Sequence, residues 1–449
     1  EQEYFSDGVT EEILNRLAQT GDLRVISRSS SFTFKGRNVS IPEVAAALKV
    51  SHVLEGSVRR AGNRVRITAQ LIEVGKDAHL WSQTFDRQLT DIFALEDEIA
   101  GAIAAALRVK LGLAPERAAP SEMADYDLLL KAKALIGTRE GPEIAAAVKI
   151  LEDLATRLPD YGEAQAQLAF AYLVATNRNV LAANTGREEG YAMADQVADR
   201  ALALEPRNVA ALVVKASVHM YAFEFEEAER LFLRALAISP NSGRAHNWYG
   251  DLLVILARRQ EGVDMEQRAV ELDPLLAVNH QNLAVAQENV GQIDEALASL
   301  RRAQAISGDS PRRVLGSLWR QGRIDEMRKV IADWTASGGS ERQLAFYVRL
   351  LKDDRDEILG WLDQGGAFQG NKFYLTMAYL SLGEFDRAAA LMEEGSVVAS
   401  TLLAWQFLFP TDPEVLAANP KYAAFWYTPP RERLLRARGH WREKAGNSD

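Results

Sequence analysis

The chain contains no cysteine and only six histidines among its 449 residues. The absence of cysteine excludes disulfides, zinc–thiolate sites and thiol nucleophiles together, but it leaves both reducing and oxidising compartments open. The histidines are dispersed along the sequence, whereas a metal site needs ligands that converge at coordination distance. We therefore expect no metal site and no cofactor in this chain.

The chain also lacks an excess of positive charge and a long apolar run. Its net charge of −10 disfavours binding to a phosphate backbone, because nucleic-acid-binding proteins usually carry a basic face. No stretch approaches the roughly 20 apolar residues that a membrane span requires. We expect no nucleic-acid binding and no membrane span in this chain.

Motifs for catalysis are missing as well. The sequence contains no glycine-rich loop ending in Gly-Lys-Ser/Thr, no Gly-x-Ser-x-Gly and no His-Glu-x-x-His. Its densest acidic run, Glu96-Asp97-Glu98, is interpreted as a solvated helix start, where the helix dipole favours negative charge. We therefore expect no catalytic residues, and an enzyme remains an alternative only if a cleft without a known motif exists.

What the sequence does contain is a repeat with a period of about 34 residues. Pro206, Pro240 and Pro274 are each separated by one such period. Three columns of small residues keep the same step: Ala194, Ala228, Gly262 and Ala296; Ala201, Ala235, Ala269 and Ala303; and Ala216, Gly250 and Ala284. Helices approach closely only where side chains are small, and proline ends a helix. The pattern predicts stacked helical hairpins, each of which needs its neighbours to complete its core.

These hairpins resemble the tetratricopeptide (TPR) repeat. The resemblance lies in residues 291–296 (Gly-Gln-Ile-Asp-Glu-Ala), which return at 383–388 and more weakly at 322–327. We expect TPR hairpins over 116–310, with a clean register over about 194–310, then degenerate hairpins over 311–409 and a capping segment over 410–449. The interval from Pro159 to Pro206 is longer than one repeat and predicts a longer connection around 177–189.

The first 115 residues show a different pattern. Apolar and polar residues alternate over 64–71, which is typical of a half-buried strand. With partner strands over 53–60 and 79–85 it forms a predicted antiparallel meander. Helices are predicted over 10–18, 42–48 and 91–111, with a short strand over 23–27 and with Glu11 and Glu12 in the acidic first turn of the first helix. The predicted fold is therefore an α+β N-terminal domain over 1–115, followed by an all-α TPR-type helical solenoid.

This first domain resembles the TolB N-terminal-like domain. The resemblance lies in residues 5–12 (Phe-Ser-Asp-Gly-Val-Thr-Glu-Glu), 53–59, 64–71 and 79–87. Such domains precede TPR arrays in bacterial class III adenylate/guanylate cyclases and in CadC-type winged-helix regulators. The resemblance implies an output domain upstream, with this chain in the periplasm if a membrane span intervenes and otherwise in the cytoplasm. It also implies a strand before the Phe-Ser-Asp-Gly phrase, which this sequence lacks.

The TPR resemblance implies a binding surface as well. In TPR arrays the first helix of each hairpin lines the concave surface, and the register places six residues there. These six predicted contact residues are Tyr221, Asn247, Asp251, Gln281, Glu288 and Asn289. Their mixed polar and aromatic character suits peptide recognition. We expect a non-catalytic module that binds a protein or peptide of unknown identity; the alternative is a small-molecule sensor, with its ligand between the N-terminal domain and the first hairpins.

Overall fold

The computed structural model describes residues 2–364, except for 19–22, 62–63, 77, 89–91, 108–122, 139, 179, 182–185, 223, 257, 341–343 and 353, together with scattered residues between 375 and 391. The predicted capping segment over 410–449 lies outside the described residues. The chain divides into two compact units: residues 1–249 with 268–275, and residues 250–267 with 276–449.

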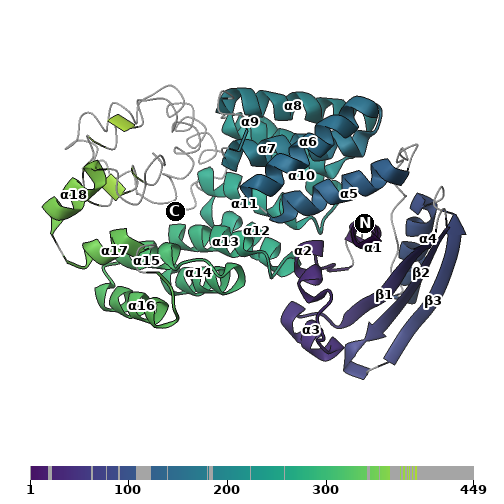
Figure 1. Cartoon of the computed structure of the whole chain (residues 1–449), viewed down its shortest axis with the longest axis horizontal. Coiled ribbons are helices and arrows are strands. Elements are labelled where there is room, and N and C mark those ends of the chain that lie inside the picture. The colour runs from purple at the N-terminus through teal and green to yellow at the C-terminus, as the bar shows by residue number, and fades with distance from the viewer. Residues whose placement is uncertain are drawn as a thin grey trace. The chain divides into compact units, whose positions relative to one another are not determined.

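The N-terminal part combines helices with one sheet (Figure 1). Its elements are α1 (Gln2–Ala18), α2 (Arg28–Ser31), η1 (Phe32–Phe34), α3 (Ile41–Leu48), β1 (His52–Ala61), β2 (Arg64–Glu73), η2 (Val74–Lys76), β3 (Ala78–Gln88) and α4 (Ile92–Ala106). Helix α3 begins after Ser40, whose backbone N–H donates to Glu43 Oε2 at 2.9 Å, and Pro42 lies in its first turn. The α+β start of the fold is present.

The three strands form the predicted antiparallel meander in the order β1-β2-β3. Val58, Ile67 and Phe85 are aligned across the sheet, with Ile67 and Phe85 buried. On the opposite face Arg64 and Arg66 are exposed, and both donate to Asp86 of β3, at 2.8 and 2.7 Å. The alternation along β2 therefore separates a core face from a solvated face, as the sequence predicted.

One core joins the sheet to the helical part. Val9 and Ile13 of α1 pack with Ile67 of β2 and Ile99 of α4. Tyr126 and Leu130 of α5 belong to this same cluster, while Leu129, Ala132 and Ile136 on other faces of α5 belong to the core of the first hairpins. Helix α5 (Met123–Thr138) thus contributes to two cores at once.

The rest of the described chain is a succession of helices joined by short turns. They are α5 (Met123–Thr138), α6 (Gly141–Arg157), α7 (Gly162–Arg178), α8 (Arg187–Leu204), α9 (Val209–Tyr221), α10 (Phe225–Ile238), α11 (Gly243–Ile255), α12 (Arg259–Leu272), α13 (Ala277–Asn289), α14 (Ile293–Ser307), α15 (Arg312–Arg320), α16 (Ile324–Ala336), α17 (Ala345–Leu350) and α18 (Arg355–Asp363). Consecutive helices pack as hairpins, for example α7 with α8 and α13 with α14.

The columns of small residues occupy the predicted places. Their alanines are 0–2% exposed. A Cβ atom added at Gly250 would meet the Glu266 side chain at 2.6 Å, so α11 and α12 approach too closely there for a larger residue. Gly291 and Gly322 have φ of +80° and +65°, a backbone conformation that glycine adopts without strain, and each ends a first helix. Close packing and tight turns explain the repeat.

The long repeat between Pro159 and Pro206 uses its extra residues in two ways. Helices α7 and α8 are 17 and 18 residues long, against 13 and 14 for α9 and α10. Helix α7 ends at Arg178 and α8 begins at Arg187, so these two helix ends bracket an interval inside the predicted range of 177–189. The extra length therefore lies in the predicted part of the chain, but some of it belongs to the longer helices α7 and α8.

Three predictions for the N-terminal part were wrong. Residues 23–27 form no strand, because their backbone hydrogen bonds go to the turns of helical hairpins: Ser27 N–H donates to Leu272 O at 2.8 Å. Helix α1 begins at Gln2, so Glu11 and Glu12 lie well past its first turn. Glu96 is not solvated but fully buried.

No helix among the described residues is long and apolar enough to cross a membrane.

Candidate functional site

Two of the six predicted contact residues lie in the first unit. Tyr221, the last residue of α9, stacks on Tyr191 with ring centroids 4.7 Å apart, and the ring of Trp248 on α11 meets it edge-on at 6.3 Å. Asn177 of α7 joins this group, since its amide donates to Tyr221 Oη at 3.1 Å and its carbonyl accepts from Tyr191 Oη at 2.8 Å. Asn247 is only 8% exposed. The half-buried Trp248 beside it is therefore the more accessible side chain.

The other four lie in the second unit. Asp251 of α11 is partly buried and accepts from Asn282 Nδ2 of α13 at 3.3 Å. Burial raises the pKa of Asp251 to about 7. A carboxyl that is half protonated at neutral pH can donate as well as accept a hydrogen bond.

The remaining three occupy α13. Glu288 accepts a hydrogen bond from Ser317 Oγ of α15, and Asn289 Nδ2 donates to its own helix at Val285 O, 2.9 Å away. Gln281 is half-buried. Glu288, Asn289 and Asp251 therefore each form a hydrogen bond inside the fold. Gln281 and Asp251, which lie on consecutive first helices, are the candidates for contact with a partner.

Sequence reasoning did not single out two side chains that directly follow predicted contact residues in the sequence. Trp248 and Asn282 are one period apart, so they occupy the same repeat position, directly after Asn247 and Gln281. A comparison of this position between repeats would have shown Trp248, which is half-buried, in one repeat and Asn282 in the next.

A second polar centre, also missed, is a buried charge cluster in the first unit. Lys133 of α5 is nearly buried, and its Nζ lies 3.1 Å from Glu11, 2.8 Å from Glu12 and 3.4 Å from Glu163. Burial disfavours its ammonium, but the three carboxylates outweigh that effect and raise the pKa of Lys133 well above its usual value. The cluster ties α1 and α7 to α5.

Glu163 extends this cluster along the first helices of the hairpins. It accepts from Gln167 Nε2 at 3.0 Å and from Asn208 Nδ2, which precedes α9, at 3.1 Å. Farther along, the guanidinium of Arg244 on α11 lies 3.7 Å above the ring of Phe170 on α7. Polar side chains thus connect three consecutive hairpins within the first unit.

The acidic run at 96–98 serves the fold. Glu96 accepts from Tyr126 Oη at 2.9 Å, and burial together with that carboxylate raises the pKa of Tyr126 well above its usual value. Asp97 pairs with Arg16 at 3.0 Å. Each charge meets a specific partner, as expected of carboxylates that hold helices together rather than of an acid–base pair.

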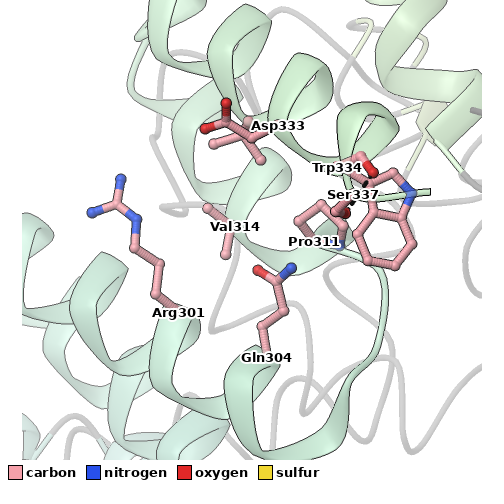
Figure 2. A pocket seen from close by; sticks show the side chains of 8 residues that line it. Arg301, Gln304, Pro311, Val314, Asp333, Trp334 and Ser337 are labelled. Carbon is pink, nitrogen blue, oxygen red and sulfur yellow. Dashed lines mark hydrogen bonds between the residues drawn. The ribbon is translucent and has the colours of Figure 1, made fainter. Parts of the chain in front are cut away.

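A pocket of about 250 Å³ lies in the second unit, among α14, α15 and α16 (Figure 2). Its lining residues are Arg301, Gln304, Pro311, Val314, Val330, Asp333, Trp334 and Ser337. Figure 2 shows Arg301 on one side of Val314 and the Trp334 ring on the other. The pocket combines an apolar floor with one cationic and one anionic side chain. Over the described residues, no group of three or more His, Asp or Glu side chains is placed to hold a metal ion.

Repeated hairpins with small residues at their crossings, and a polar and aromatic face on the first helices, define this chain as a TPR-type helical-repeat protein with a small α+β start. No family model matches it. Over 140 residues, 30% of the chain, it is 46% identical to a protein of Rhizobium meliloti (strain 1021) named "Putative adenylate cyclase 3". The match spans 24% of that relative's length.

Solved structures give distant likenesses. A thermophilic TPR protein of Thermus thermophilus is 18% identical, with a TM-score of 0.36 over 43% of this chain and 98% of that chain. Human IFIT1, solved as a dimer with PPP-AAAA, is 12% identical, with a TM-score of 0.43 over 78% of this chain and 79% of that chain. Because both TM-scores are below 0.5, the solenoid is assigned from the helices and the small-residue columns of this chain.

Proposed function

We propose that this chain is a non-catalytic interaction and regulatory module, which binds a protein or peptide on the first helices of its hairpins. The observation that carries the proposal is the pair Asp251 and Gln281, which lie on consecutive first helices and are only partly buried. Peptide recognition of this kind uses polar groups presented by neighbouring helices.

The proposal extends to nucleotide-cyclase signalling. The 140 residues shared with the Rhizobium meliloti protein support it, since that protein carries a cyclase name. In this view the N-terminal part is a TolB-like domain, as its resemblance implies, and the whole chain is the sensory or scaffolding part that regulates a cyclase or, as in CadC-type regulators, a DNA-binding domain. The six predicted contact residues and the domain limits at 115, 310 and 409 are part of this proposal.

The test is a binding experiment with a matched control. The purified chain is crosslinked in a bacterial extract, the captured protein is identified, and its affinity is then measured with purified components. We expect Asp251→Ala with Gln281→Ala to weaken binding at least about tenfold, as loss of two interfacial contacts would. The control, Glu227→Ala with Arg230→Ala, removes an exposed ion pair from the second helix α10 and should leave affinity unchanged. Equal affinity of both double variants would contradict the assigned surface.

A small-molecule sensor is the second candidate, favoured by the pocket of Figure 2. Its volume of about 250 Å³ fits a small ligand, whose apolar body would pack on Trp334 while polar groups meet Arg301 and Asp333. This place differs from the predicted one between the N-terminal domain and the first hairpins. In a thermal-shift screen of soluble metabolites, a ligand of this pocket should raise Tm in the wild type but not in Trp334→Ala, because binding to the native state stabilises it. A shift that survives the substitution would place the ligand elsewhere.

A further inference from the structure

Residues 23–31 run along the turns between hairpins and form hydrogen bonds with them. On the α10–α11 turn, the amide of Asn241 donates to Leu23 O at 2.5 Å. At the end of α12, Arg24 Nη1 donates to Glu271 O at 3.0 Å and Ser27 N–H donates to Leu272 O at 2.8 Å. The segment thus satisfies backbone carbonyls that a helix end leaves without a partner of its own.

The strongest link is between Ser30 and Asp273. Ser30 is fully buried on the short helix α2, and Asp273, which follows α12, is 4% exposed. The Ser30 hydroxyl donates to Asp273 Oδ1 and accepts from the backbone N–H of Leu275 at 2.7 Å. Figure 1 shows α2 beside the end of α12. The buried Ser30 hydroxyl therefore forms hydrogen bonds with two residues of the α12–α13 turn, Asp273 and Leu275.

The contacted stretch is also the place where the chain passes between its two compact units. Residues 268–275 belong to the first unit, whereas 250–267 and 276 onward belong to the second. Helix α12 (Arg259–Leu272) is therefore shared between the units, and its end is the part held by residues 23–31.

We infer that residues 23–31 and 268–275 form a latch, which couples the N-terminal part to the end of α12 and opens as a unit in the native protein. Through the latch, a conformational change at the end of α12 would be transmitted to the N-terminal part. It deepens the proposed function, on which it rests, because it gives the module a regulatory element at the end of α12. Apart from Arg24, its donors are uncharged, and it contains a single carboxylate, so its bonds can break without leaving a large cluster of like charges buried.

Hydrogen exchange of the whole chain, read by mass spectrometry, tests the latch without any partner. In the wild type, both segments should exchange faster than the buried helix α7, because they open locally. Ser30→Ala should speed exchange about tenfold or more in residues 23–31 and in 268–275 together, since it removes the shared hydroxyl. The matched control is Ser31→Ala, whose hydroxyl bonds only to Ser27 O within the same segment. It should leave 268–275 unchanged.

The absence of native cysteine allows the closed state to be locked. Ser30→Cys with Asp273→Cys, oxidised to a disulfide, should slow exchange in both segments below the wild-type rate, and reduction should reverse the effect. Two results would overturn the inference: faster exchange in 23–31 alone for Ser30→Ala, or wild-type exchange in both segments as slow as in α7. Since no partner is used, failure of the binding experiment and failure of the latch are separate outcomes.

Discussion

Replacing Lys133 with methionine is expected to lower the free energy of unfolding by about 3 kcal/mol, among the larger effects of a single substitution. The substitution keeps the length of the side chain but removes the ammonium. Glu11, Glu12 and Glu163 would then face one another across α1, α5 and α7 without the cation that they share. Chemical denaturation followed by circular dichroism measures the loss.

Lys215 provides a matched comparison. It too bridges two carboxylates, Asp195 at 3.0 Å and Asp199 at 2.8 Å, but it is more exposed than Lys133. Lys215→Met should therefore cost about 1 kcal/mol or less. Adding Glu12→Gln to Lys133→Met should restore part of the stability, because it removes one of the uncompensated charges. If Lys133→Met cost no more than Lys215→Met, the cluster would be a solvated ion pair and not the link between α1 and the hairpins.

The repeat could be predicted from the sequence because it has a local cause. Small residues at Ala228 or Gly250 are required wherever two helices cross, and that requirement recurs with every hairpin. The alternation over 64–71 is local in the same sense, since each residue of β2 faces either the core or solvent. Both patterns survive in a single sequence without any knowledge of distant partners.

The misread segments have distant partners. Residues 23–27 include the apolar Leu23 and the β-branched Val25 and Ile26, which favour a strand. Their hydrogen bonds nevertheless go to residues near 241 and 272, more than 200 positions away. Glu96 looked solvated because charges usually are, and only the fold brings Tyr126 to it. Lys133 gave no signal for the same reason, because its partners lie on α1 and α7. The candidate contact residues were predicted by register alone, and their role stays a prediction.

Ionisation of Asp251 should lower the free energy of unfolding as pH rises. Replacement of Asp251 by asparagine should abolish this dependence on pH. Its pKa is raised from 3.8 to about 7 by burial, so between those values the folded chain binds a proton that the unfolded chain has released. The stability that this proton contributes is fully present below pH 4 and is lost as pH rises to about 7, after which it stays level. Asp251→Asn, which is neutral at every pH, should therefore gain on the wild type as pH rises.

We expect the stability advantage of Asp251→Asn over the wild type to grow by roughly 2 kcal/mol between pH 4.5 and pH 8. The full shift would correspond to about 4 kcal/mol, and the partial exposure of the carboxyl reduces that figure. Thermal melts between pH 4.5 and 8.5 measure the difference. A constant difference across this range would mean that Asp251 is already ionised at pH 4.5 and well hydrated. A carboxyl of that kind would meet a cationic partner group with the same strength at pH 6 and pH 8, whereas the buried Asp251 should bind such a group more tightly as it ionises.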